Sequence, residues 1–264
     1  MALADYINEK PVIETRYLVL RPFKRSDLES LKSWMNDSRL YTYWGKGPGK
    51  ADKDPQLLFE QPKKPVKSFH LGIEEKSSQR VIGDIWVYLI ENNRMASVAI
   101  RMASESQNQG YGTEAMAAMS RFCFEKTELQ RLWAEVDVRN IASQRMLEKC
   151  GFTKEGMIRQ GKMVNTWCDY YIYGLLKSDY RQTVERIEEM EKKYDRLSEA
   201  ANSDPDQIER DPELKRIKNE LSEYLDGGQW QIDYQLDEAG ILPEELKRGV
   251  LSQDGLYDLL EELS

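Results

Sequence analysis

The chain has 264 residues and a formal net charge of −8; residues 1–180 hold 27 Lys and Arg against 23 Asp and Glu, whereas residues 181–264 hold 11 against 23. It has no concentrated stripe of basic residues, and its three cysteines and one histidine lack metal-ligand spacing, so we expect no nucleic-acid binding, no disulfide framework and no metal site. Residues 1–14 hold no apolar core of secretory length and no apolar run approaches about 18 residues, so we expect a cytoplasmic protein that makes no use of a membrane.

The first two thirds of the chain predict a mixed α/β domain. Runs rich in β-branched and aromatic residues, bounded by polar turns, predict strands at 16–21, 68–74, 81–90, 96–102, 132–138, 152–158 and 167–175. Apolar residues at helical spacing predict helices at 26–34, 112–126 and 140–149. The first helix is expected to open with a capping box formed by Ser26 and Glu29. Residues 37–66 are rich in Gly, Pro and aromatic residues and predict a long connection that takes part in ligand binding.

Strand signals stop beyond Ser178, and the remaining sequence predicts charged amphipathic helices. Their apolar faces run through 184–197, 214–225 and 252–263, and residues 202–211 predict a turn-rich break. We therefore expect two domains, one over 1–180 and an acidic helical one over 181–264.

The segment from Gln107 to Ala115 lies between a predicted strand and a predicted helix and has glycines at 110 and 112. Glycine permits backbone angles that other residues avoid and lets the main chain approach a ligand closely. The first amides of the following helix have no partner within the helix and lie at its positive end. This arrangement predicts an anion site that suits a pyrophosphate. An isolated GxG is more often a turn that merely starts a helix.

Several motifs in the same order resemble the GNAT superfamily of N-acetyltransferases. Gln107, Gly110 and Gly112 match its Q/R-x-x-G-x-G/A loop, and residues 140–143 followed by 147–152 are similar to its N-x-x-S/A helix that ends in GF. The likeness extends to the RimJ/RimL-like branch through residues 15–22, 155–156 and 173–176. The whole resemblance covers about residues 12 to 180. Residues 183–263 resemble a small domain family of unknown function.

The resemblance implies an α/β (α+β) fold: a mixed, mostly antiparallel sheet flanked by helices, followed by a small all-α domain. Two central strands, here 96–102 and 132–138, would splay apart and admit the pantetheine arm of acetyl-CoA. The main chain of Ile100 and Met102 would pair with this arm. The residues that the resemblance places on the cofactor are Ile100, Met102, Gln107, Asn108, Gln109, Gly110, Tyr111, Gly112, Thr113, Asn140 and Ser143.

The implied reaction is direct attack of a primary amine on the thioester, with backbone donors on the oxyanion and no metal. We expect Glu135, on a strand beside the gap, to act as general base; the alternative is a solvated strand carboxylate. Many family members place a tyrosine acid where this chain has Leu147, so Ser143 inherits that role by position. Enzymes that modify ribosomal protein termini carry a glutamate where Lys162 stands here. This difference weakens the inference that the chain acts on the same substrate.

The acceptor amine is expected to be a protein N-terminus or a small molecule. Tyr43, Trp44 and Asp169 are the residues predicted to contact it, although aromatics near glycines more often pin a loop. His70 is expected to be a core residue. The acidic C-terminal helices predict a structural or interaction role, through a homodimer or a partner protein.

Two other functions compete with this interpretation. Gly110-x-Gly112-x-x-Ala115, with Glu135 about twenty residues on, also fits a dinucleotide fingerprint and thus an NAD-binding oxidoreductase. The antiparallel strands that precede the motif argue against it. The second alternative is a non-catalytic protein that keeps the fold for CoA binding or regulation, and the intact glycine loop argues against that.

Overall fold

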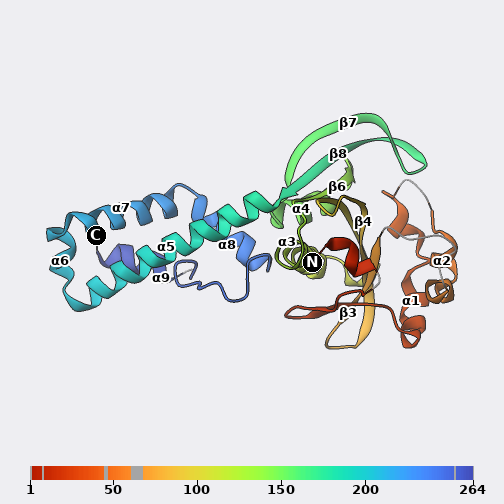
Figure 1. Ribbon diagram of the computed structural model, residues 1–264, viewed down its shortest axis with the longest axis horizontal. Coiled ribbons are helices and arrows are strands. Elements are labelled where there is room, and N and C mark those ends of the chain that lie inside the picture. The colour runs from red at the N-terminus through yellow and green to blue at the C-terminus, as the bar shows by residue number, and fades with distance from the viewer. Residues whose placement is uncertain (1, 8, 45–46, 61–67, 253, 264) are drawn as a thin grey trace. The chain divides into compact units, whose positions relative to one another are not determined.

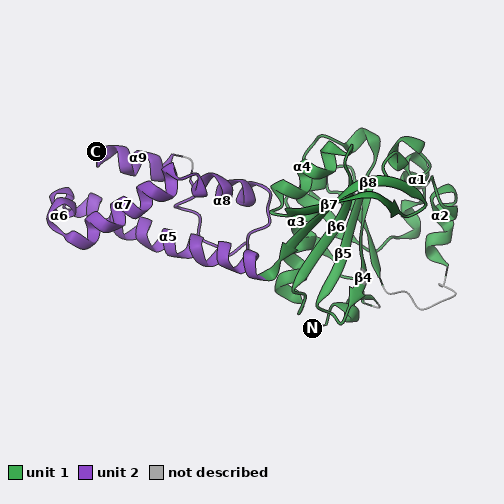
Figure 2. Ribbon diagram, turned by 90° about the horizontal axis from the view of Figure 1, so that it is seen from above, with its two compact units in different colours: residues 1–177 green, residues 178–264 purple. Residues whose placement is uncertain are grey.

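A computed structural model describes residues 2–7, 9–44, 47–60, 68–252 and 254–263 (Figure 1). The chain forms two compact units, Met1–Lys177 and Ser178–Ser264 (Figure 2). The predicted position of the change from strands to helices, near residue 180, lies close to the division between these units. Within the described ranges, no helix is long and apolar enough to cross a bilayer.

The first unit is built on a mixed sheet with the strand order β1-β2-β3-β4-β5-β6-β8-β7. The strands are β1 Ile13–Glu14, β2 Leu18–Arg21, β3 Phe69–Glu75, β4 Arg80–Glu91, β5 Met95–Met102, β6 Arg131–Asp137, β7 Thr153–Met163 and β8 Thr166–Leu176. Neighbouring strands pair antiparallel throughout this order, except that β5 and β6 are parallel. The predicted mostly antiparallel sheet is confirmed.

Helices cover both faces of this sheet, as Figure 2 shows. They are α1 Leu28–Trp34, α2 Lys50–Lys53, α3 Tyr111–Lys126 and α4 Ile141–Lys149. On one face the Tyr173 hydroxyl of β8 donates to Glu148 of α4 at 2.8 Å. On the other face the Trp34 indole of α1 donates to the Val81 carbonyl of β4 at 2.9 Å. We call these the α4 face and the α1 face.

Local sequence signals explain how these helices begin and end. Asn140 caps α4, because its Oδ1 accepts from the Ser143 amide at 3.2 Å. After α4, Gly151 has φ +81°, its amide donates to the Glu148 carbonyl and the Phe152 amide donates to the Leu147 carbonyl, an arrangement typical of a glycine C-cap. The capping box predicted for Ser26 and Glu29 is wrong. A 3-10 turn at Arg25–Asp27 precedes α1, and the buried Asp27 carboxylate accepts from the Lys24 amide at 2.7 Å.

The second unit contains the helices α5 Lys177–Ser203, α6 Pro205–Arg210, α7 Pro212–Asp226, α8 Gln229–Glu238 and α9 Gly255–Glu262. The three predicted helices correspond to α5, α7 and α9. The predicted break at 202–211 instead holds α6, which Pro205 starts, and α8 was not predicted. Asp233 of α8 is fully buried and accepts from Arg186 at 2.6 Å and from the Tyr224 hydroxyl at 2.9 Å, which joins α5, α7 and α8.

Candidate functional site

The central feature of the first unit is a gap between β5 and β6. The two strands pair only at Met95–Arg131, Ala96–Leu132 and Ser97–Trp133. Beyond that last rung, β6 continues to pair with β8 as far as Asp137, while β5 continues to pair with β4. The edges of residues 98–102 and 134–137 therefore face each other without a ladder between them.

The phase of the β4–β5 ladder decides which main-chain groups face this gap. The Ala103 amide donates to the Ile82 carbonyl at 2.8 Å, in register with the strand pairs. Hydrogen-bonded and non-hydrogen-bonded pairs alternate in an antiparallel ladder. The N–H and C=O groups of Ile100 and Met102 consequently point away from β4 and into the gap. The Met102 carbonyl accepts from Gln107 Nε2 at 3.1 Å.

The glycine loop lies at the C-terminal end of β5 and leads directly into α3. Gly110 has φ +84°, a left-handed conformation that favours glycine, whereas a Cβ added there would meet nothing within 4 Å, so the need for glycine is conformational and not steric. The first helical bond runs from the Glu114 amide to the Gly110 carbonyl at 3.0 Å. The amides of Tyr111, Gly112 and Thr113 find no acceptor among the described residues, and they form the positive end of a 16-residue helix. This end of α3 can bind a phosphate group.

Side chains of the loop bond to the protein and leave its main chain free for a ligand. Besides the bond from Gln107 to Met102, Gln109 Nε2 donates to the Glu105 carbonyl at 2.9 Å. The Tyr111 hydroxyl donates to Glu75 on β3 at 2.7 Å. Asn108 has φ +60°, a left-handed conformation that asparagine tolerates better than most residues. These bonds hold the loop in the shape that exposes its amides.

Glu135 lies on the α1 face of β6, two residues beyond the last rung. Burial raises the pKa of its carboxyl above the ordinary glutamate value, although the residue as a whole is exposed. Its charge in turn raises the pKa of Tyr88 on β4 and of Tyr170 on β8, where burial is the larger cause in each case. Glu135 is therefore within electrostatic reach of residues from both neighbouring parts of the sheet. A carboxylate whose pKa is raised is a better proton acceptor.

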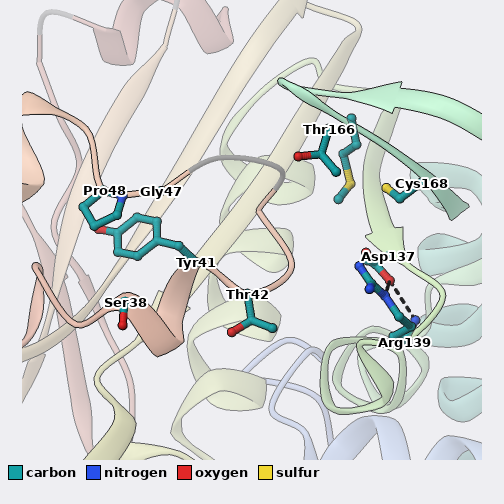
Figure 3. Close-up of a pocket in the computed structure, with 10 residues that line it drawn as sticks. Ser38, Tyr41, Thr42, Gly47, Pro48, Asp137, Arg139, Thr166 and Cys168 are labelled. Atoms are coloured by element: carbon teal, nitrogen blue, oxygen red, sulfur yellow. Dashed lines mark hydrogen bonds and ion pairs between the residues drawn. The ribbon is translucent and has the colours of Figure 1, made fainter.

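A pocket of about 330 Å³ opens on the same face (Figure 3). It lies between the segment after α1, the end of β6 and the β7–β8 hairpin. The lining residues are Ser38, Tyr41, Thr42, Gly47, Pro48, Asp137, Arg139, Met163, Thr166 and Cys168. Asp137 accepts from Arg139 Nη2 at 2.6 Å and from the Arg139 amide at 2.9 Å, and so braces the turn before Asn140.

None of the three residues predicted to contact the acceptor is among the lining residues of this pocket. Tyr43 has the Arg139 guanidinium 5.7 Å from its ring centre. Trp44 packs edge to face on Trp86, with 5.5 Å between ring centres. Asp169 accepts from the Gln160 amide at 2.7 Å, within the irregular part of the β7–β8 hairpin. Residues 45, 46 and 61–67 of the predicted binding connection lie outside the described residues.

A protein-family model described as an acetyltransferase (GNAT) domain matches residues 17–153, which is more than half of the chain. The chain belongs to the GNAT acetyltransferase family. A second model, for a domain of unknown function named DUF4298, matches residues 187–264. Several N-acetyltransferases are similar to this chain. The uncharacterized N-acetyltransferase YoaA of Bacillus subtilis (strain 168) is 27% identical over 63% of this chain and 97% of its own length. The spermidine N(1)-acetyltransferase of Vibrio cholerae is 26% identical over 56% of this chain and 86% of its own length.

Solved GNAT structures share this fold. An acetyltransferase of the GNAT family from Bacillus anthracis matches with a TM-score of 0.57 and 22% identity, over 64% of this chain and 99% of that one. The Vibrio cholerae spermidine N-acetyltransferase, solved with CoA and spermine, matches with a TM-score of 0.54 and 22% identity. The match covers 62% of this chain and 98% of that one. The chain is thus an acetyl-CoA-dependent N-acetyltransferase that transfers acetyl groups to amines. The alternative of an NAD-binding oxidoreductase is wrong, because the sheet is mostly antiparallel and the family is GNAT.

One cluster in this GNAT domain was missed in the sequence. Arg101 of β5 is buried, and its Nη2 lies 2.6 Å from Asp84 of β4 while its Nη1 lies 2.9 Å from Asp52 of α2. The guanidinium also contacts the rings of Trp34, Tyr41, Trp44 and Trp86. The available signal was a pair of charged residues, Asp84 and Arg101, inside two otherwise apolar strands. The cluster ties the segment that lines the pocket to the sheet.

His70 lies at the border of this cluster and is half-buried, whereas a core residue was expected. Its ring stacks on Trp86 with 4.3 Å between centres, and its Nε2 lies 3.2 Å from Asp84 Oδ2. Burial lowers the pKa of His70, against the opposing effect of Asp84. A neutral imidazole that bonds Asp84 supports the ion pair with Arg101 rather than catalysis.

Proposed function

We propose that this GNAT domain transfers the acetyl group directly from acetyl-CoA to a primary amine while both are bound. The observation that carries this is the position of the gap, which opens from the glycine loop and has Glu135 and the pocket on one face. The cofactor supplies an acyl group on a thioester, whose thiolate leaves readily because a thiol has a pKa near ~8.5. Amines entering from the pocket would meet that acyl group on the α1 face.

Main-chain groups would hold the cofactor. The amides of residues 108–113 suit its diphosphate, because they lie at the positive end of α3 with Gly110 open to solvent. The outward N–H and C=O groups of Ile100 and Met102 suit the amides of its arm, as an added strand pairs with an edge. Asn140 and Ser143, at the start of α4, complete the proposed cofactor site.

Glu135 is the proposed general base. An alkylammonium has a pKa near ~10 and must lose a proton before its nitrogen can attack. The raised pKa of Glu135 makes it a stronger acceptor than an ordinary glutamate, and its exposure lets an acceptor or a water reach it. Ser143 is the proposed proton donor to the leaving sulfur. Its main-chain amide donates to Oδ1 of Asn140, the N-cap residue of α4, and this bond fixes where the helix begins.

The proposed acceptor is a small-molecule amine or the amine of a peptide, and Tyr43, Trp44 and Asp169 are the residues proposed to hold it. Named relatives act on spermidine and on aminoglycosides, and one is named a ribosomal N-acetyltransferase. Membership in the RimJ/RimL-like branch remains a prediction.

We also propose that residues 181–264 form a separate domain with a structural or interaction role. The second unit has its own buried centre around Asp233 and carries the excess of acidic residues. Deleting these residues should leave a folded acetyltransferase with altered assembly or kinetics. Unchanged kinetics and unchanged oligomeric state in the truncated protein would contradict that role.

The experiment that tests the proposed function is a CoA-release assay across a panel of amines: polyamines, aminoglycosides and peptides with free N-termini. The wild-type protein should release CoA with at least one class. Glu135→Gln and Ser143→Ala should slow release with the same acceptor. Undiminished turnover in both variants would remove the catalytic assignments, and no acetyl-CoA binding would remove the function itself.

A further inference from the structure

Two buried polar atoms belong to the two residues of the rung where β5 and β6 part. Among the residues that the structure describes, Trp133 Nε1 is a buried donor without a hydrogen-bond partner, and the buried Ser97 Oγ makes no hydrogen bond of good geometry, although the Tyr88 hydroxyl lies near it. Ser97 and Trp133 are Cα partners on the last rung of the parallel pairing. Partners in neighbouring strands project to the same face of a sheet, so both side chains leave this rung on the α1 face, as Glu135 does.

The chemistry of these atoms restricts what can bind between them. A buried polar group without a partner costs about 1–3 kcal/mol, and such groups are almost always paired with protein or with ordered water. The indole N–H is a donor only, whereas a serine hydroxyl both donates and accepts. The occupant must therefore offer an acceptor oxygen to Trp133. A water molecule meets this requirement and can bond Ser97 as well, whereas an ammonium group cannot accept.

Further polar groups surround the same rung. Tyr88 of β4 is the partner of Ser97 in the antiparallel ladder, and Glu135 follows Trp133 by two residues on the same face. Burial raises the pKa of the Tyr88 phenol, the Ser97 hydroxyl opposes this rise from within hydrogen-bonding range of the phenol, and the Glu135 charge adds to it. Tyr88, Ser97 and Glu135 are thus close enough to interact, and they make this corner of the sheet polar enough to hold a water.

The position of the rung relates it to the acyl group. The gap is closed at Ser97–Trp133 and open at the end that leads to the glycine loop. If the diphosphate binds that loop, the arm runs toward the closed end, and the acyl group at its tip lies nearest to the rung. This step rests on the proposed cofactor site.

We propose that Ser97 and Trp133 hold a water molecule that forms the end wall of the acyl site and so restricts the enzyme to short acyl groups. An acyl chain longer by one carbon would displace this water. Because an added methyl group cannot accept a hydrogen bond, the indole N–H of Trp133 would be left unpaired. The two residues thereby discriminate between acetyl- and propionyl-CoA.

The test compares the binding of acetyl-CoA and propionyl-CoA to the full chain by calorimetry, so that it needs no knowledge of the acceptor. The wild-type protein should bind acetyl-CoA more tightly. Trp133→Phe keeps a planar ring but removes the N–H, and should reduce this preference about tenfold, because one unpaired buried donor is worth 1–3 kcal/mol. Ser97→Ala should reduce it in the same direction by a smaller factor. A crystal structure of the wild-type protein should show a water within hydrogen-bond distance of Ser97 Oγ and Trp133 Nε1.

Two matched variants serve as controls. Trp230 is a buried tryptophan of the second unit whose indole donates to Val250 at 2.8 Å, and Ser120 is a buried serine that donates to Met116 at 2.9 Å. Trp230→Phe and Ser120→Ala should leave the preference unchanged. The proposal is overturned if the preference also stays unchanged in Ser97→Ala and in a folded Trp133→Phe, or if the site between the two atoms is dry. Failure of the wild-type protein to bind either thioester would instead refute the cofactor site.

Discussion

The Arg101 guanidinium lies 2.6 Å from the Asp84 carboxylate in the interior of the GNAT domain, and Asp84 is fully buried. The ion pair joins β4 to β5, the strand whose other edge faces the gap. Burial lowers the pKa of Arg101. The carboxylates of Asp84 and Asp52 outweigh this effect, so the pKa of Arg101 is raised overall. The cluster therefore stabilises the pocket and the gap together.

Removing one partner of this pair should destabilise the domain strongly. Asp84→Asn leaves the Arg101 charge buried without its main partner, and we expect a loss of about 3–5 kcal/mol in the free energy of unfolding, measured by urea denaturation. The exposed pair of Arg196 and Glu213 serves as the control, since Glu213→Gln should cost less than about 1 kcal/mol. Equal effects of the two substitutions would contradict the role of the cluster.

Gly110→Ala should weaken acetyl-CoA binding with little effect on the rest of the fold. Gly110 has φ +84°, and a non-glycine residue held in the left-handed region costs roughly 1–2 kcal/mol. Relaxation of that strain would move the amides that face the diphosphate, so we expect a Kd raised about tenfold or more in calorimetry, as 1.4 kcal/mol is a factor of ten. Gly156→Ala, on β7 with free space around its Cβ, is the control. An unchanged Kd for Gly110→Ala would argue against the loop as the diphosphate site.

Glu135 should set the acidic side of the pH–rate profile. Its pKa is raised in the folded protein, so the carboxylate form that accepts a proton is lost at a higher pH than for an ordinary glutamate. The kcat/KM value should therefore rise with pH as Glu135 ionises. Glu135→Gln should remove this limb and lower kcat/KM by about 10²–10⁴, as for other general bases. The exposed Glu128→Gln serves as a charge control. A profile whose acidic limb survives in Glu135→Gln would assign the titration to another group.

Asp233 should stabilise the second unit alone. Asp233→Ala leaves Arg186 and the Tyr224 hydroxyl without their shared partner, and we expect a loss of roughly 1–3 kcal/mol. Hydrogen exchange should show faster opening of α5, α7 and α8 and unchanged protection of β4, β5 and β8. Equal loss of protection in both units would show that they unfold as one and would contradict the two-domain proposal.

The sequence predicted those parts of the molecule that local chemistry determines. Asn140 and Gly151 delimit α4 because a side-chain cap and a left-handed glycine act within a few residues. The glycine loop was recognisable for the same reason, since Gly110 and the free amides of α3 are adjacent in the chain. Ile100 and Met102 followed from a resemblance, and the ladder phase set by Ala103 and Ile82 gives their direction.

What the sequence did not reveal depends on contacts between distant residues. Asp52, Asp84 and Arg101 come from three elements, and no spacing indicates that they meet. The unpaired atoms of Ser97 and Trp133 depend on where the β5–β6 ladder ends, which is a property of the folded sheet. Asp27 was missed as the partner of Lys24 because Arg21 and Glu74 fix its position from outside the helix.

The most direct measurement is a crystal structure of the full chain with acetyl-CoA. The account predicts the diphosphate against the amides of residues 108–113 and the arm between β5 and β6, with its amides bonded to the main chain of Ile100 and Met102. A cofactor bound elsewhere, or a gap that stays empty at saturating acetyl-CoA, would contradict it.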